Sequence, residues 1–363
     1  MMSKKPVMVA DIKAVDRGDA VSLMEPLLIS ESSPHRGPLT DLALDLAQKS
    51  AGLRRSLPSA LLASLANLVR GMNCYYSNLI EGHDTHPVDI ERALKNDYGQ
   101  DTRKRDLQLE AKAHIAVQQW IDTGGLRGGR AIKAGGISEI HRRFCELLPE
   151  ALLWVEDPIT KERLRLTPGE FRKRDVRVGD HVAISPGALP RFLERFEQVY
   201  GNLGKADWII SSAAAHHRLL WMHPFMDSNG RVARLMSHAT LLEILDTGAV
   251  WSVARGLARN VQQYKTLLAN CDSARRDDLD GRGTLSEEAL AEFTRFFLMV
   301  SIDQVSFMDS LMQPNRLRTR ILLWAGEETN LGQLPAKSAS ILEAVLYRGE
   351  LPRGAAIWTG AGV

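Results

Sequence analysis

Residues His223 to Arg234 read HPFMDSNGRVAR, and this stretch decides how the rest of the chain is interpreted. It separates two segments of helical periodicity, at about 208–222 and 232–245. Pro224 resists continuation of the first helix, and Asp227-Ser228-Asn229-Gly230 has the composition of a turn. We therefore predict a helix, a tight loop and a second helix that begins near Arg231.

The start of the second helix is a predicted anion site. Small residues at a helix N-terminus leave backbone N–H groups free, and the helix dipole adds positive potential there. Arg231 and Arg234 are three residues apart in the first turn, so both can approach one anion. Because the dipole disfavours cations at this end, two arginines indicate a polyanion such as a triphosphate.

Two further residues add chemistry to this anion site. Asp227 supplies the hard oxygen ligand that Mg²⁺ takes beside phosphates. His223 is the one side chain in the stretch that can act as a base near neutral pH. A lone histidine before proline is usually structural, and a Ser-Asn-Gly turn is usually only a turn. Their occurrence together, in this order, predicts a nucleotide-phosphate and metal site with a histidine base.

The surrounding sequence predicts a mainly helical fold. Apolar residues recur at spacings of three and four over much of residues 39–122 and 189–325, whereas DVRVGDHVAI alternates around Gly179-Asp180 as in a short hairpin. We divide the chain into a loosely structured lead-in (1–38), an N-terminal helical region (39–130), a catalytic core (131–270) and a C-terminal helical region (271–363).

Composition excludes several classes of protein. The net charge of +2 gives no reason to expect a nucleic-acid partner, and no apolar run is long enough to span a membrane. Three scattered cysteines predict neither a disulfide framework nor a zinc site. The N-terminal residues contain no apolar stretch of signal-peptide length. We expect a cytoplasmic protein.

The stretch from His223 to Arg234 resembles the signature of the Fic family, H-P-F-x-D/E-G-N-G-R-x-x-R, except that Ser228 replaces a glycine. The resemblance implies a Fic-type helical bundle that transfers AMP from ATP to a hydroxyl of a protein. His223 would take the proton of the target hydroxyl, and Asp227 would hold Mg²⁺ between the α- and β-phosphates. Phosphate would be bound by the segment Ser228, Asn229, Gly230, Arg231, Val232, Ala233 and Arg234, with Arg231 on the β-phosphate and Arg234 on the γ-phosphate.

Similarity to the family extends over roughly residues 60–300. Gly169-Glu170-Phe171-Arg172 and the hairpin VRVGDHVAISP resemble the flap that holds an extended segment of the target protein, so the flap is expected to pair with backbone. Asn260 and Tyr264 resemble residues that lie near the nucleoside. The resemblance also allows a homodimer.

An upstream segment, Ser77-Asn78-Leu79-Ile80-Glu81-Gly82, resembles the inhibitory S/T-x-x-x-E-G/N helix of the family. Ser77 and Glu81 are four residues apart on one helix face, and Gly82 is a plausible helix stop. The resemblance implies that Glu81 pairs with Arg234 and displaces the γ-phosphate. The sequence therefore predicts an adenylyltransferase that is inhibited at rest and can modify itself.

Other functions remain open at this stage. The same site could use another donor, as in transfer of UMP, phosphocholine or phosphate, or it could remove AMP. The chain could instead be a non-catalytic ATP sensor whose C-terminal tail touches DNA, because residues 338–360 resemble the opening of a winged helix-turn-helix without its recognition helix.

Overall fold

The computed structural model describes residues 13–83, 85–156 and 161–348. The described chain is mainly helical, as predicted, and its strands form two small hairpins. Two compact units divide at Val305 and Ser306, whereas the predicted C-terminal region begins at residue 271. The first unit contains the whole of the predicted site.

The longer helices of the first unit have the following bounds: α1 Arg36–Ser56, α2 Ser59–Ile80, α3 Pro87–Leu94, α4 Thr102–Asp122, α5 Ala134–Glu146, α6 Leu189–Tyr200, α7 Lys205–Met222, α8 Asn229–Leu245, α9 Val253–Arg259 and α10 Val261–Asn270. Helix α11, Glu287–Met312, crosses the division, and α12 (Pro314–Asn330) and α13 (Ser338–Arg348) pack together in the second unit. Single 3-10 turns are η1 Val21–Met24, η2 Arg130–Ile132, η3 Glu150–Leu153 and η4 Pro186–Ala188.

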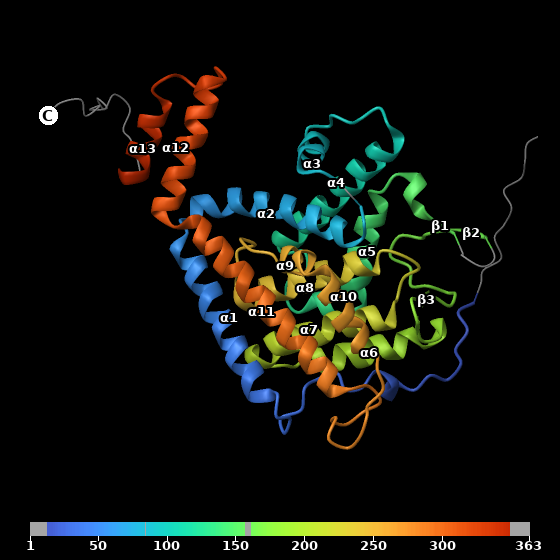
Figure 1. The fold of residues 1–363 in the computed structure, drawn as a ribbon. Coiled ribbons are helices and arrows are strands. Elements are labelled where there is room, and N and C mark those ends of the chain that lie inside the picture. Colours follow the sequence, from blue (N-terminus) through green and yellow to red (C-terminus); the bar gives the residue numbers. More distant parts are fainter. Residues whose placement is uncertain (1–12, 84, 157–160, 349–363) are drawn as a thin grey trace, which may run out of the picture. The chain divides into compact units, whose positions relative to one another are not determined.

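Helices α7 and α8 form the centre of the first unit (Figure 1). Most residues of both are buried, including polar ones such as His216 and Ser237, because neighbouring helices cover them on several sides. In the same view helix α2 lies above α8 and α9, and it packs against α9 and α4. The predicted loop between α7 and α8 is therefore held from two sides by a tightly packed helix pair.

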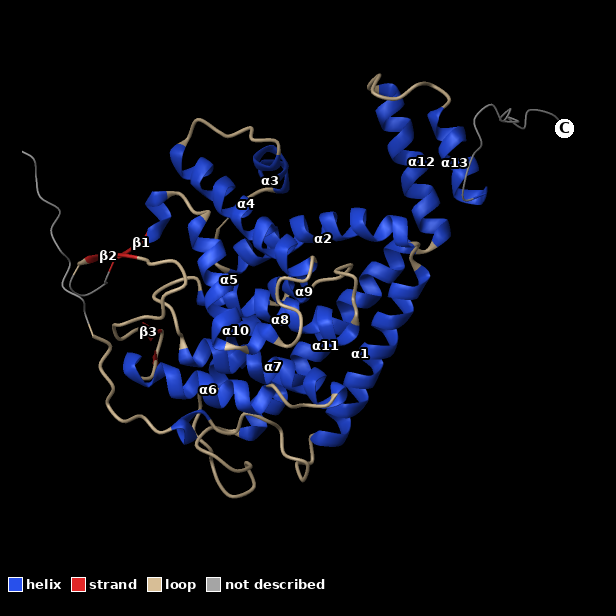
Figure 2. Ribbon diagram, turned by 180° about the vertical axis from the view of Figure 1, so that it is seen from behind, coloured by secondary structure: helices blue, strands red, loops and turns tan. Residues whose placement is uncertain are grey.

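The predicted hairpin around Gly179-Asp180 is confirmed, and a second hairpin accompanies it. Strand β3, Arg177–Val178, pairs antiparallel with β4, His181–Val182, and Gly179 adopts a positive φ of 60° in the turn. Strand β1, Trp154–Glu156, pairs with β2, Arg163–Arg165. Figure 2 shows both hairpins on one side of the helices.

Residues 13–35 contain only one short 3-10 turn, but polar contacts attach them to the first unit. Arg17 makes an ion pair with Asp175 at 2.8 Å, beside the flap, and the amide of Ser185 donates to Asp19 at 2.8 Å. The Tyr200 hydroxyl donates to the carbonyl of Leu27 at 2.8 Å. This part of the predicted lead-in therefore braces the base of the flap.

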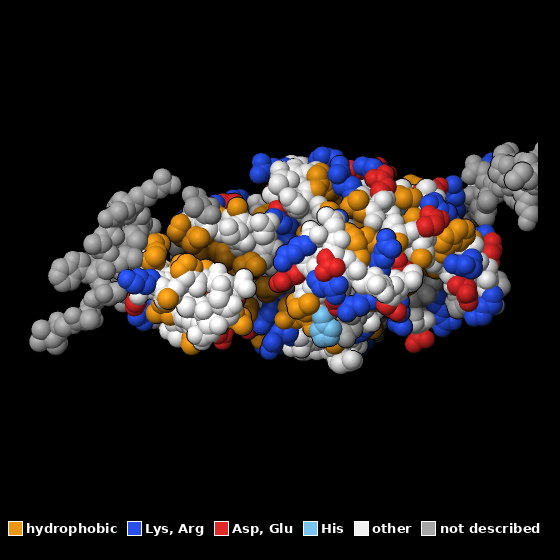
Figure 3. Space-filling view, turned by 90° about the horizontal axis from the view of Figure 1, so that it is seen from above, with side chains coloured by type: hydrophobic (Ala, Val, Ile, Leu, Met, Phe, Trp, Pro, Cys, Tyr) orange, Lys and Arg blue, Asp and Glu red, His pale blue; other side chains and the backbone are white. Residues whose placement is uncertain are grey.

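Further features concern the surface, the membrane and the C-terminus. On the face drawn in Figure 3, basic and acidic side chains lie interspersed. No helix among the described residues is long and apolar enough to cross a membrane. The part of the winged-helix resemblance that follows α13, residues 349–360, lies outside the described residues.

Candidate active site

The loop between α7 and α8 is closed by its own side chains. Asn229 accepts a hydrogen bond from the amide of Phe225 at 3.0 Å and donates one to the Phe225 carbonyl at 2.9 Å. Ser228 adopts the left-handed conformation, with φ of 66°, directly before α8. Glycine adopts this conformation without strain, which explains why a glycine is usual at this position of the signature.

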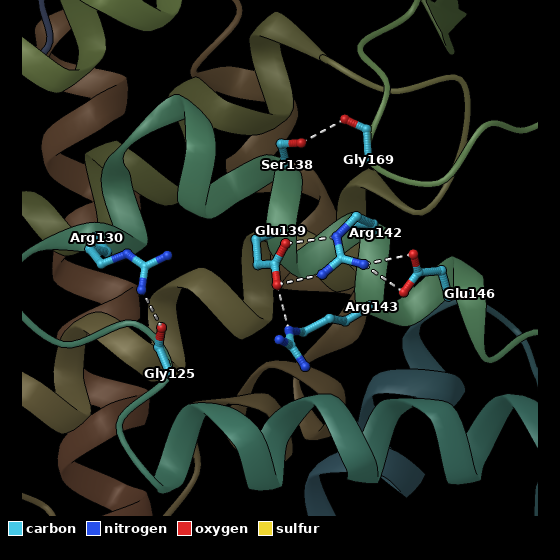
Figure 4. A network of polar contacts seen from close by, with 8 residues as sticks. All are labelled: Gly125, Arg130, Ser138, Glu139, Arg142, Arg143, Glu146 and Gly169. Carbon is cyan, nitrogen blue, oxygen red and sulfur yellow. Dashed lines mark hydrogen bonds and ion pairs between the residues drawn. The ribbon is translucent and has the colours of Figure 1, made fainter.

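Helix α5 packs against the loop between α7 and α8. Phe225 is fully buried, and its ring stacks on His141 with centroids 3.9 Å apart. His141 also accepts from the amide of Gly169 at 2.9 Å, and Ser138 donates to the Gly169 carbonyl at 2.6 Å (Figure 4). The turn before the flap and the anchor of the loop are therefore fixed to one helix.

Arg172 joins the flap to the predicted base. Its guanidinium is buried and donates to the carbonyls of His223 at 2.7 Å, Ile184 at 2.5 Å and Met222 at 3.3 Å. The amide of Arg172 also donates to the Pro224 carbonyl at 2.9 Å. These contacts hold His223, which has a positive φ of 47°, at the junction of α7, the flap and the loop.

His223 is held in the state that a base requires. Its Nδ1 donates to the carbonyl of Leu220 at 3.3 Å, which leaves the lone pair on Nε2. Burial lowers the pKa of His223 to about 4, against the smaller opposing effect of that hydrogen bond. The imidazole is therefore neutral at physiological pH and can accept a proton.

Arg234 is in contact with the predicted inhibitory segment. Its Nη2 lies 2.5 Å from the Glu81 carboxylate, and its Nε donates to the Ser77 hydroxyl at 2.9 Å. A Cβ placed on Gly230 would come within 2.5 Å of Glu81 Oε1, so the carboxylate lies against the predicted phosphate loop. Burial alone would raise the pKa of Glu81, but the charges of Arg234 and Arg231 lower it to about 2.

Arg231 has a partner that the sequence interpretation missed. Glu110 on α4 makes an ion pair with Arg231, and both residues are at most 5% exposed. His83, just after the inhibitory segment, lies 2.8 Å from the other Glu110 oxygen. A sequence signal existed, because Glu110 falls in line with Ala113, Val117 and Ile121 on the apolar face of its helix.

The remaining predicted residues occupy different surroundings. Asp227 is exposed, and its Oδ1 accepts from the amide of Ser228 at 2.6 Å. Val232 and Ala233 are buried in the first turn of α8. Gly82 directly follows Glu81, the C-terminal cap of α2, and has a positive φ of 81°.

Asn260 and Tyr264 do not share one environment. Asn260 is exposed at the edge of a hollow of about 550 Å³ between α10 and α11. Tyr264 is buried, and its hydroxyl lies 2.8 Å from His216 Nε2. The second nitrogen of His216 contacts Ser237 at 2.9 Å, so this histidine has a structural role beneath the loop.

The part of the chain that contains the site matches a known protein family. The model of the Fic/DOC family matches residues 132–241, which include α5, the flap, the loop and most of α8. The chain contains a Fic domain. The resemblance to the Fic family that the sequence indicated is thereby confirmed for residues 132–241.

Curated relatives and solved structures extend this similarity. Over 224 residues the chain is 28% identical to the protein adenylyltransferase Fic of Drosophila erecta, a match that covers 59% of this chain and 42% of the relative. The protein of the same name from Culex quinquefasciatus is 28% identical over 197 residues, covering 53% and 34%. The chain thus spans less than half the length of these relatives.

Solved structures share the fold of the Fic domain and its surroundings. A Fic family protein from Desulfovibrio desulfuricans G20 superposes with a TM-score of 0.57 at 16% identity, over 88% of this chain and 81% of that one. Fic-1 (residues 134–508) from C. elegans superposes with a TM-score of 0.54 at 16% identity, over 77% and 76%. At these identities the superpositions show the fold.

Proposed function

We propose that this chain is an autoinhibited protein adenylyltransferase that transfers AMP from ATP to a serine, threonine or tyrosine hydroxyl of a protein. The curated relatives carry this activity in their names. The observation that carries the proposal is the placement of a neutral His223 beside a loop whose Arg234 is already paired with Glu81. The first feature serves the reaction and the second restrains it.

In the proposed reaction each side chain of the site has a defined role. Nε2 of His223 accepts the proton of the target hydroxyl, and the hydroxyl oxygen forms a bond to the α-phosphorus of ATP. The bond from that phosphorus to the bridging oxygen breaks, and pyrophosphate leaves. Backbone N–H groups at the start of α8 and the two arginines bind the phosphates and stabilise the charge that develops on them.

The residues present fit a magnesium ion beside bound phosphates. Mg²⁺ usually keeps several waters and takes one or two carboxylates together with phosphate oxygens. Asp227 offers an exposed carboxylate at the mouth of the loop, and one of its oxygens already accepts from the Ser228 amide. When bound there, the metal would neutralise charge on the phosphates.

The flap is suited to an extended protein segment. Its exposed strands, β3 and β4, are two residues each and offer unpaired backbone groups at their edges. His181 of the flap donates to the Trp221 carbonyl at 2.7 Å, so the hairpin is attached close to His223. A segment paired with the flap would present its hydroxyl near the base.

The test is intact-mass spectrometry after incubation with MgATP. Glu81→Gly protein is expected to gain the mass of one or more AMP groups, on itself or on an added protein, and Glu81→Gly/His223→Ala protein is expected to gain none. Nucleotide binding without a mass change in either protein would favour an ATP sensor. A different added mass with UTP or another donor would assign a different transfer.

A further inference from the structure

The acidic partners of Arg231 and Arg234 differ in their burial and in their position along a helix. Arg234 is paired with Glu81, whose side chain is 31% exposed and caps the end of α2. Arg231 is paired with Glu110, whose side chain is 4% exposed and lies in the middle of α4. A capping residue at a helix end can be displaced by a local change, whereas Glu110 is enclosed where α4 packs on α8.

The contacts of Arg231 show how it is held. Its guanidinium lies over the ring of Phe144 at 5.6 Å, and its Nη2 makes the ion pair with Glu110. His83 Nδ1 lies 3.1 Å from this Nη2 and 2.8 Å from the second Glu110 oxygen; a proton on Nδ1 that is donated to the carboxylate leaves no lone pair there for Arg231. The Nε of Arg231 has no hydrogen-bond partner among the described residues. Glu110 therefore provides the charged anchor of a side chain that is otherwise held by packing.

We infer that Glu110 is a positioning residue for phosphate transfer and that it acts through Arg231. This inference rests on the proposed function, in which Arg231 binds phosphate. Glu110 stays in place when Glu81 leaves, so it fixes the direction of the Arg231 guanidinium during the reaction. Glu81 opposes the reaction, and Glu110 supports it.

Removing Glu110 has two opposing effects on phosphate binding, but only one of them, the loss of alignment, acts on the rate. Loss of a nearby negative charge favours the phosphates, whereas loss of the anchor lets Arg231 turn away from them. A misplacement of about 1 Å can lower a rate by about 100-fold. In Glu81→Gly protein we therefore expect Glu110→Ala to lower kcat by roughly 10- to 100-fold, while KM for ATP changes by less than about 3-fold.

A double-mutant cycle separates this role from a general structural one. If Glu110 acts through Arg231, adding Glu110→Ala to Glu81→Gly/Arg231→Ala protein changes kcat by less than about 3-fold. The matched control is Gln108→Ala, on the same helix and equally buried, which bonds to the Asp89 carbonyl and the Gly99 amide and leaves Arg231 untouched. This control is expected to leave kcat within about 3-fold.

Thermal unfolding of the same variants tests the contact without turnover. Removing one partner of a buried ion pair leaves an unpaired charge, so the double variant should lose less stability than the sum of the losses of the two single variants. Additive losses of stability, or a fall in kcat that is the same with and without Arg231, would overturn the inference. So would an increase in kcat for Glu110→Ala. Absence of transfer by Glu81→Gly protein itself would refute the proposed function and leave the stability cycle as the test of the contact.

Discussion

The contact between Glu81 and Arg234 allows one prediction to be developed in quantitative terms. In Glu81→Gly protein the guanidinium of Arg234 is free to bind the γ-phosphate, and space opens beside Gly230, where Glu81 Oε1 now lies. Opposite unit charges about 4 Å apart attract by about 4 kcal/mol at an effective dielectric of about 20. Because the Glu81 side chain is 31% exposed, solvent screening and desolvation reduce this value, and we take about 2 kcal/mol as the net effect.

A difference of about 2 kcal/mol corresponds to roughly 30-fold in affinity. We therefore expect the Kd of MgATP, measured by isothermal titration calorimetry, to fall by roughly 30-fold in Glu81→Gly protein. Glu81→Gln is the matched control, because it removes the charge and retains the bulk beside Gly230. Its Kd should lie between those of the other two proteins. A Kd for Glu81→Gly within about twofold of the unmodified chain would refute the reasoning, since ~0.4 kcal/mol is too little for a charged contact to control the site.

Further predictions concern pH, the metal and Ser228. For Glu81→Gly protein, kcat/KM for MgATP, which reports the nucleotide-free enzyme, should show no loss of His223 base function above pH ~5 and such a loss only near pH 4, because burial lowers the pKa of His223 to about 4; an acid limb near pH ~6.5 would contradict this. The carboxylate of Glu81, with a pKa lowered to about 2, should stay charged down to pH ~4, so the ratio of Kd values between the unmodified and Glu81→Gly proteins should be constant from pH 5 to 8. Asp227→Ala should abolish the Mg²⁺-dependent gain in ATP affinity and lower transfer by ~100-fold or more, while affinity measured in EDTA stays unchanged; an unchanged Mg²⁺ dependence would remove Asp227 from the metal site. Ser228→Gly should change the free energy of unfolding by less than about 1 kcal/mol, because relief of left-handed strain opposes the greater freedom of the unfolded chain; a loss above ~2 kcal/mol in a urea titration would show that the serine side chain stabilises the loop.

The sign of the Glu81 effect on stability also follows from its pKa. A carboxyl whose folded pKa lies below its ordinary value contributes stability above that ordinary value, and the contribution disappears as the pH falls toward the folded pKa. The pKa of Glu81 is lowered from 4.5 to about 2, so its contribution is complete at neutral pH and is lost between about pH 4.5 and pH 2. The contact between Glu81 and Arg234 is therefore not a pH switch in the physiological range.

Features built from residues that are close together in the sequence could be predicted from the sequence alone. The residues from His223 to Arg234 form one loop and one helix start, so their order already specified a base, an anion site and a carboxylate. The hairpin around Gly179-Asp180 was equally visible, because alternation and a two-residue turn are local properties. The Ser77–Glu81 spacing predicted that both residues lie on one helix face. The resemblance to the Fic family indicated Arg234 as the partner of Glu81.

Tertiary structure decided which distant groups meet these residues. Glu110 reaches Arg231 across 121 positions of sequence because α4 packs on α8. His141 lies under Phe225, and Arg172 binds the His223 carbonyl, because α5 and the flap converge on the same loop. Burial, and with it the lowered pKa of His223, depends on that convergence. The sequence by itself determined which chemical groups the site contains, since they are contiguous, whereas packing determined their charge states and counter-ions, since those depend on helices brought together only in the fold.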